Sequence, residues 1–167
     1  RQALHDGLTG LPNRTMLLER LRDALQRSGG TQPAALLVMD LNQFKEINDT
    51  LGHEHGDRLL IEVSRRLRRV ASASATIARL GGDEFAVLLD PGDTEDALDC
   101  ATAIRSALEE PFHLSGIDIQ ANAAVGIAVH PAHGLDAEQL VQRADVAMYA
   151  AKRVSGAYAV YDPAHDQ

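Results

Sequence analysis

The stretch Arg79-Leu80-Gly81-Gly82-Asp83-Glu84-Phe85 decides the fold, because it places two glycines and two acids between two short apolar runs. The flanking runs, residues 76–80 and 85–89, are typical of strands. A Gly-Gly pair between strands predicts a hairpin, since both glycines accept positive φ. Asp83 is then expected at the hairpin tip. Taken alone, the pattern also fits an ordinary turn with a solvated acid.

A second acid follows a buried strand earlier in the chain. The apolar run 34–39 predicts a strand buried on both faces, and that strand is expected to end at Asp40. Helices are expected over residues 43–51 and 57–70. The second of these helices carries a basic face that we expect to be solvated, formed by Arg65, Arg66, Arg68 and Arg69.

The rest of the chain alternates between helical and extended patterns. Asn13 can cap the first helix, and Pro111 ends the fourth. The alternating run 117–129 predicts one long strand with one covered face. The remaining expected elements are helices over residues 14–26, 94–109 and 136–152 and a strand over 158–161. This order predicts an α+β fold, a mostly antiparallel five-stranded sheet covered by helices.

Composition limits the class of protein. A chain of 167 residues suits a single domain. The net charge of -8 argues against general binding to nucleic acid or to an anionic membrane, so a nucleotide would need local cations and metal. Cys100 is expected to be a buried, inert thiol. No apolar run approaches the ~20 residues that span a bilayer, and no signal peptide is evident, so we expect a soluble, cytoplasmic domain.

Four ordered motifs make the chain resemble the GGDEF family of diguanylate cyclases, and the resemblance spans the chain. The motifs are His5 to Arg14; Asp40 with Phe44-Lys45, Asn48-Asp49, Gly52-His53 and Gly56-Asp57; Arg79 to Phe85; and Ala144-Asp145 with Met148-Tyr149 and Lys152. The resemblance implies a fold similar to the palm of adenylyl cyclases and polymerases. Residues 1–167 are expected to be one GGDEF domain cut from a larger signalling protein, linked to sensory or EAL domains.

The resemblance also implies a metal site. It assigns metal binding to the side chains of Asp40 and Asp83 and to the backbone carbonyl of Leu41. Two carboxylates with phosphate oxygens suit Mg²⁺, expected as two ions per site, with Mn²⁺ or Ca²⁺ able to replace it for binding. Glu84 would assist activation of the attacking hydroxyl or bind metal indirectly. The alternative interpretation is that these acids are helix caps and turn residues.

The resemblance assigns guanine recognition to Asn48 and Asp57, which implies GTP as the substrate. Carboxylate and amide groups match the donors and acceptors of guanine. Asp57 could equally be the N-cap of the helix over residues 57–70, and Asn48 a helix-terminal residue.

The triphosphate is expected where a strand passes into a helix. The backbone N–H groups of Gln43, Phe44 and Lys45 lie at that position, where the helix dipole favours anions. The resemblance adds Gly82 and Lys152 as substrate contacts. Lys45 is either a catalytic cation or an exposed first-turn lysine, and Phe44 fits a core anchor better than a base-stacking platform.

Two departures from the family pattern concern phosphate binding and feedback. Gly156 stands where the family usually has an arginine four residues after Lys152, and the neighbouring Arg153 starts roughly 100° around the helix. Ser72 and Ala75 occupy the two positions of the product-inhibition motif Arg-x-x-Asp. Neither can form an ion pair, so no inhibition through that site is expected.

Two hypotheses for function remain. The first is a diguanylate cyclase, a nucleotidyltransferase that condenses two GTP into cyclic di-GMP and two pyrophosphates across a homodimer. The alternative is a GTP-binding regulatory module with little turnover that controls an adjoining domain such as an EAL phosphodiesterase. Gly156 favours the module, and the intact acids Asp83 and Glu84 favour the enzyme. A third reading, an unrelated acidic interaction domain, requires all four motifs to be coincidental.

Overall fold

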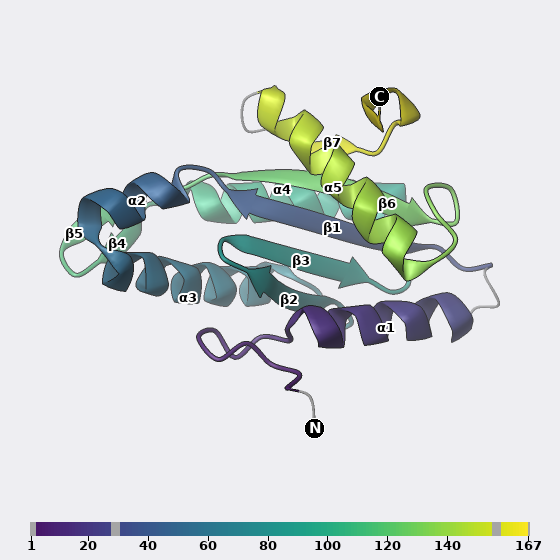
Figure 1. Cartoon of the computed structure of the whole chain (residues 1–167), viewed down its shortest axis with the longest axis horizontal. Coiled ribbons are helices and arrows are strands. Elements are labelled where there is room, and N and C mark those ends of the chain that lie inside the picture. Colours follow the sequence, from purple (N-terminus) through teal and green to yellow (C-terminus); the bar gives the residue numbers. More distant parts are fainter. Residues whose placement is uncertain (1–2, 28–30, 155–157, 167) are drawn as a thin grey trace.

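The computed structural model describes residues 3–27, 31–154 and 158–166, and these form a five-stranded sheet with helices on both faces (Figure 1). The strand order is β2-β3-β1-β6-β7. Only the pairing of β6 with β7 is parallel within this sheet; the other three pairings are antiparallel. The strands are β1 (Ala34–Leu41), β2 (Thr76–Gly81), β3 (Glu84–Leu89), β6 (Ala123–His130) and β7 (Tyr158–Val160). The predicted mostly antiparallel α+β sheet is confirmed.

The helices form two layers, one on each face of the sheet. On one face, α3 (His53–Val70) and α4 (Thr94–Glu109) pack against alternate strand residues such as Leu37 and Met39. On the other, α1 (Arg14–Arg27) and α5 (Ala137–Arg153) pack against Leu36 and Val38. The short helix α2 (Phe44–Leu51) connects β1 to α3. Strand β1 is therefore buried on both faces, as its continuous apolar run predicts.

The prediction of a single strand over residues 117–129 is wrong. Ile117–Ile119 (β5) pairs with Phe112–Leu114 (β4) in a separate two-stranded sheet, and β6 begins only at Ala123. Strand β6 is also buried along its whole length, not on one face. The reason is size: a Cβ at Gly126 would lie 2.2 Å from the carbonyl oxygen of Ala144 in α5. Small residues on the second face let α5 pack directly on the strand.

Two element boundaries near the predicted site differ from expectation. Helix α3 begins at His53 instead of residue 57, so Asp57 lies inside the helix and the interpretation of Asp57 as its N-cap is wrong. Strand β1 does not stop before Asp40 but continues through Leu41. Asp40 is therefore held by the β-ladder on both sides, opposite Glu84 in β3 and Ala124 in β6.

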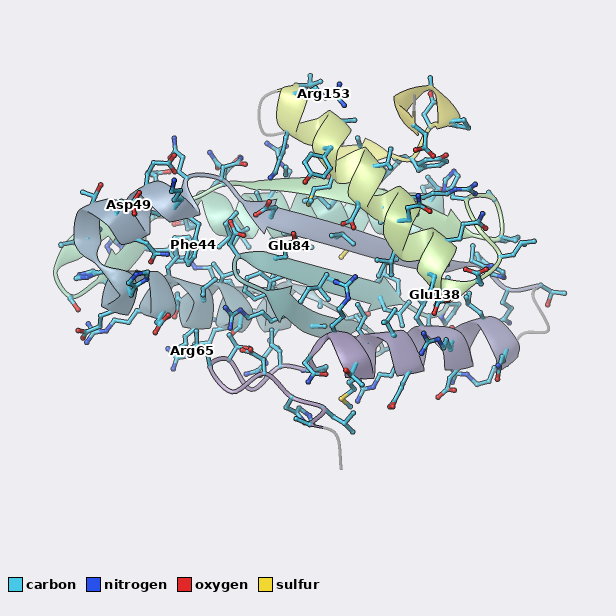
Figure 2. The ribbon with its side chains drawn as sticks, viewed as in Figure 1. Phe44, Asp49, Arg65, Glu84, Glu138 and Arg153 are labelled. Atoms are coloured by element: carbon cyan, nitrogen blue, oxygen red, sulfur yellow. The ribbon has the colours of Figure 1, made fainter. Side chains whose placement is uncertain are left out.

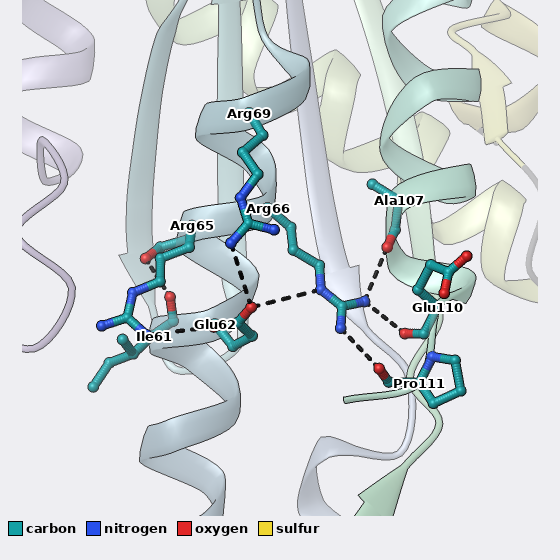
Figure 3. Close-up of polar contacts among 9 residues, drawn as sticks. Ile61, Glu62, Arg65, Arg66, Arg69, Ala107, Glu110 and Pro111 are labelled. Carbon is teal, nitrogen blue, oxygen red and sulfur yellow. Dashed lines mark hydrogen bonds and ion pairs between the residues drawn. The ribbon is translucent and has the colours of Figure 1, made fainter. Parts of the chain in front are cut away.

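The expected solvated face of α3 needs a correction at Arg66, whose side chain is only 12% exposed. Its guanidinium donates hydrogen bonds to the carbonyl oxygens of Ala107 (3.0 Å), Glu110 (2.5 Å) and Pro111 (2.9 Å) (Figure 3). It also lies 3.5 Å from the ring centroid of Phe112. Helix α4 has no basic residue in its last turn, so Arg66 supplies the cation that its carbonyl end favours.

The structure also bears on two expectations from the sequence, which concern Cys100 and membrane-spanning segments. Cys100 is half-buried rather than fully buried, and burial raises the pKa of its thiol to about 11, as expected of an unreactive cysteine. Within the described ranges, none of the helices is long and apolar enough to cross a membrane.

Candidate active site

The β2–β3 hairpin places Asp83 beside the end of β1. The ladder shifts between Arg79 and Gly81, and Gly81 pairs with Glu84, so the two-residue loop is Gly82-Asp83. Gly81 and Gly82 have φ values of 145° and 49°, which explains the need for glycine at both positions. The backbone N–H of Leu41 donates to the carbonyl oxygen of Asp83 at 3.2 Å. The hairpin tip is therefore tied to the strand end that carries Asp40.

Asp40 and Asp83 form a close pair of carboxyl groups. Burial raises the pKa of Asp83 to about 7, and the neighbouring Asp40 carboxyl group adds to the rise. Asp40 is 13% exposed, and its Oδ1 is buried with no hydrogen-bond partner among the described residues. A buried, unpaired carboxylate oxygen beside a second carboxyl group is a donor set that fits a hard divalent cation. No larger cluster of metal-ligating side chains occurs within residues 3–27, 31–154 and 158–166.

Lys152 in the last turn of α5 reaches the same acids. Its Nζ donates a hydrogen bond to Asp40 Oδ2 at 2.5 Å and lies 5.5 Å from the ring centroid of Tyr149. The hydrogen bond to Asp40 is the main cause that raises the pKa of Lys152, and the charges of Asp40 and Asp83 add to it. The ammonium group therefore offsets part of the negative charge at the site.

Glu84 lies on the same face of the sheet as Asp40, because the two residues are directly opposite in the antiparallel ladder. Figure 2 shows Glu84 at the start of β3, where this strand runs beside β1. Its pKa is raised first by burial and then by the charges of Asp145 and Asp40, while Arg14 and Lys152 oppose the rise. Burial also raises the pKa of Asp145, and Arg14 opposes that shift.

The sequence prediction gave no role to Arg14 or Asp145. Arg14 begins α1 and Asp145 lies in α5, yet both act electrostatically on Glu84 in the folded domain. The signal was present, because Arg14 ends the first motif and Asp145 belongs to the last. Only the packing of α1 and α5 on one face of the sheet places the two residues near the hairpin.

The predicted phosphate-binding segment lies at the start of α2. Gln43 is the N-cap residue, with a left-handed φ of 65°, and the helix begins at Phe44. The N–H of Asn42 donates to the carbonyl oxygen of Asn122 at 2.9 Å, which fixes the connection from β1. The first-turn N–H groups lack intrahelical acceptors, as at any helix start. Phe44 packs against the core, as expected of an anchor, while Lys45 is exposed.

Asn48 and Asp57, the residues predicted to bind guanine, lie on two neighbouring helices. Asn48 is in α2 and Asp57 is in α3. A Cβ at Gly56 would lie 1.8 Å from Asn48 Oδ1, so Gly56 is needed for the amide to rest against α3. Asp57 follows Gly56 and is exposed. The fold thus brings Asn48 next to the residue that precedes Asp57, although the four helical positions 53–56 of α3 had been assigned to a loop.

Of the two departures from the family pattern, the structure describes only the one at Ser72 and Ala75. Gly156 lies outside the described residues. Ser72 and Ala75 lie in the connection from α3 to β2, where the N–H of Ala75 donates to the carbonyl oxygen of Ser72 at 3.1 Å. A surface hollow of about 680 Å³ near this connection, lined by residues that include Arg20, Ser74 and Thr76, contains none of the predicted site residues.

The fold and the site together define a palm-like α+β domain with an acidic centre where a hairpin tip meets the end of the central strand. Residues 3–156 match the family model described as "Diguanylate cyclase, GGDEF domain". The chain belongs to this family, whose members work in cyclic di-GMP signalling.

The similar proteins include some that are named as diguanylate cyclases and some that are named only as phosphodiesterases. The chain is 44% identical over 151 residues to the bifunctional diguanylate cyclase/cyclic di-GMP phosphodiesterase MucR of Pseudomonas aeruginosa, covering 90% of this chain and 22% of MucR. It is 35% identical over 164 residues to the cyclic di-GMP phosphodiesterase PdeR of Escherichia coli, covering 97% of this chain and 24% of PdeR. The chain thus spans about a quarter of these relatives' length.

A solved structure agrees closely with the fold. The GGDEF domain of TpbB from Pseudomonas aeruginosa superposes with a TM-score of 0.93 at 40% sequence identity, covering 97% of this chain and 96% of that one.

Proposed function

We propose that this domain is a diguanylate cyclase that condenses two GTP molecules into cyclic di-GMP and two pyrophosphates. The observation that supports this proposal best is the pairing of Asp40 with Asp83, in which Asp40 Oδ1 is buried without a partner among the described residues. Such a pair is electrostatically unfavourable by itself and is suited to a divalent cation bound with a triphosphate.

The metal site would consist of the carboxylates of Asp40 and Asp83 and the backbone carbonyl of Leu41. Bound Mg²⁺ would neutralise developing charge on the departing pyrophosphate and favour the deprotonated hydroxyl. Lys152, already bonded to Asp40, would contact the terminal phosphates when the nucleotide is present. The N–H groups of Gln43, Phe44 and Lys45, with Gly82, would hold the rest of the triphosphate.

Each turnover forms two phosphodiester bonds. In each, the 3′-hydroxyl oxygen of one GTP attacks the α-phosphorus of the other, the bond to the β-phosphate breaks, and the hydroxyl proton leaves. Glu84 stands opposite Asp40 in the ladder and is the carboxylate suited to accept that proton or to orient the hydroxyl. One domain binds one GTP, so two domains must face each other as a homodimer.

Asn48 and Asp57 would select guanine, since their amide and carboxylate match its hydrogen-bonding edge. The proposed location is the cytoplasm, where GTP is available, either free or as the cytoplasmic part of a membrane-anchored protein. The proposed partners are a second GGDEF domain and covalently linked sensory or EAL domains.

The test is to incubate the purified domain with Mg²⁺ and GTP at high protein concentration and to detect cyclic di-GMP by mass spectrometry. An Asp83→Asn variant is the matched control, and a fusion to a dimerising coiled coil supplies the second domain. We expect product from the native domain and at least a hundredfold less from the variant. Tight GTP binding without product, even in the fusion, would contradict the cyclase.

A second candidate function is a GTP-binding regulatory module that controls an adjoining domain. Gly156 in place of the usual phosphate-binding arginine favours it, and PdeR, a phosphodiesterase by name, is similar over 97% of this chain. Loss of one charge-assisted contact to phosphate costs about 1.5–3 kcal/mol. The variant Gly156→Arg restores the arginine that the family usually has at this position. If loss of this phosphate contact limits catalysis, the variant should turn over GTP faster than the native domain.

A further inference from the structure

Two hydrogen-bond acceptors are buried without a partner where α2 meets α3, as far as the structure describes the chain. They are Asn48 Oδ1 and His55 Nε2. Buried polar atoms in native proteins nearly always have partners, so two such atoms at one helix contact require an explanation. Both residues are only partly buried as a whole.

The protonation of His55 follows from its other ring nitrogen. His55 Nδ1 lies 3.1 Å from the carbonyl oxygen of Leu51 in α2. Because a carbonyl oxygen only accepts hydrogen bonds, Nδ1 carries the proton in the neutral imidazole and Nε2 is an acceptor. His55 Nε2 and Asn48 Oδ1 are therefore both hydrogen-bond acceptors without a donor among the described residues.

The two acceptors belong to the same end of the α2–α3 pair. Asn48 rests against Gly56, the residue after His55, and His55 reaches back to Leu51, one turn beyond Asn48 in α2. Asp57 presents its carboxylate to solvent on the other side of Gly56. Asn48, His55 and Asp57 therefore supply hydrogen-bond acceptors from two adjacent helices.

We propose that His55 is a further specificity residue, which accepts through Nε2 a hydrogen bond from the 2-amino group of bound guanine. The proposal rests on the proposed GTP site at Asn48 and Asp57 and deepens it. Guanine presents N–H donors at N1 and at the 2-amino group, whereas hypoxanthine lacks the 2-amino group and adenine lacks both. The buried acceptors match a base rich in donors on one edge.

The test compares binding of GTP and ITP, whose bases differ only in the 2-amino group, by isothermal titration calorimetry with Ca²⁺. We expect the native domain to bind GTP at least about fivefold more tightly than ITP, the effect of about one hydrogen bond. His55→Phe keeps a ring but removes the acceptor, so it should weaken GTP binding and leave ITP binding unchanged. His55→Gln, which retains an acceptor, should restore most of the preference. The matched control is His113→Phe at an exposed histidine of β4.

The outcomes separate this inference from the function on which it rests. Equal weakening of GTP and ITP by His55→Phe would indicate a structural role and overturn the inference while leaving the GTP site in place. An unchanged GTP preference would also overturn it, and would indicate that water satisfies Nε2. A native domain that binds neither nucleotide would contradict the GTP site itself and the inference with it. Circular dichroism of each variant verifies folding, and His55→Gln decides the case if His55→Phe does not fold.

Discussion

Lys152 Nζ donates to Asp40 Oδ2 at 2.5 Å, so the ammonium of α5 is bound to the carboxylate at the end of the central strand. The lysine therefore occupies one oxygen of a proposed metal ligand. A cation at Asp40 and the ammonium compete for that oxygen, whereas a triphosphate attracts both.

Replacing Lys152 by Met is expected to affect metal and nucleotide in opposite directions. Binding of Mn²⁺ without nucleotide should tighten about fivefold, because loss of a partly exposed ion pair changes the free energy by about 1 kcal/mol. GTP affinity should weaken about tenfold through loss of a phosphate contact. Electron paramagnetic resonance measures free Mn²⁺, and calorimetry measures GTP binding. Arg153→Met, the neighbouring charge change, should leave both within twofold; equal effects of the two variants would contradict the prediction.

Among the arginines of α3, Arg66 is expected to contribute most to the free energy of unfolding. Arg66→Ala removes three charge-assisted hydrogen bonds to carbonyl oxygens and the contact with Phe112. We expect the free energy of unfolding to fall by about 2–4 kcal/mol. Arg65→Ala, at a side chain that is 62% exposed, should change it by less than about 0.5 kcal/mol. Urea denaturation measures both, and similar losses for the two variants would refute the assigned role of Arg66.

Asp6 and Arg79 connect the first motif to the β2–β3 hairpin, and their ion pair predicts a pH dependence of stability. Arg79 donates to Asp6 Oδ1 at 3.0 Å and to the carbonyl oxygen of Gly82 at 2.8 Å. Burial tends to raise the pKa of Asp6, but hydrogen bonds from Thr9 and Arg79 outweigh it and hold the pKa below its usual 3.8.

A lowered folded-state pKa means that this stabilisation is present above pH 3.8 and is lost as the pH falls through the folded value. Asp6→Asn should therefore reduce stability by about 1 kcal/mol at pH 7, and the difference from the native domain should shrink toward zero in stronger acid. Thermal unfolding across this pH range measures it. A difference that stays constant with pH would show that the Asp6 charge is not responsible.

Feedback by product is expected to be absent at the α3–β2 connection, and it can be introduced there. Ser72 and Ala75 carry no charge, so neither can form an ion pair with a phosphate or offer a carboxylate to a guanine edge. The double variant Ser72→Arg with Ala75→Asp supplies both groups and should give inhibition by added cyclic di-GMP that the native domain lacks. Initial rates with increasing product measure this. Native inhibition that disappears on changing Ser72 or Ala75 would contradict the prediction.

Much of the fold could be predicted because local patterns and tertiary structure agree. The double-sided burial of β1 and the hairpin at Asp83 follow from apolar runs and glycine pairs. The division of residues 117–129 into β5 and β6 could not be predicted, since alternation continues across Gln120-Ala121-Asn122 although the chain changes sheets there. The position of Asp57 within α3 was missed because Gly52 and Gly56 are typical of loops. Gly56 is nevertheless helical, and its lack of a side chain leaves room for the Asn48 amide.

Side-chain interactions between distant elements were the least predictable part of the site. The Lys152–Asp40 contact joins residues from α5 and β1, and the influence of Arg14 on Glu84 joins α1 to β3. Neither interaction has a local pattern, because each depends on which face of the sheet a helix covers.

The close contact of Gly126 with α5 has a consequence for register. Since both faces of β6 are apolar, hydropathy would tolerate a slip of the strand by one residue. Residue volume would not, because the slip would turn Val125 and Ile127 toward the backbone of Ala144 and Met148, where even a single methyl group does not fit. The alternation of large and small side chains in β6 therefore fixes the alignment of α5 on the sheet, and with it the reach of Lys152 to Asp40.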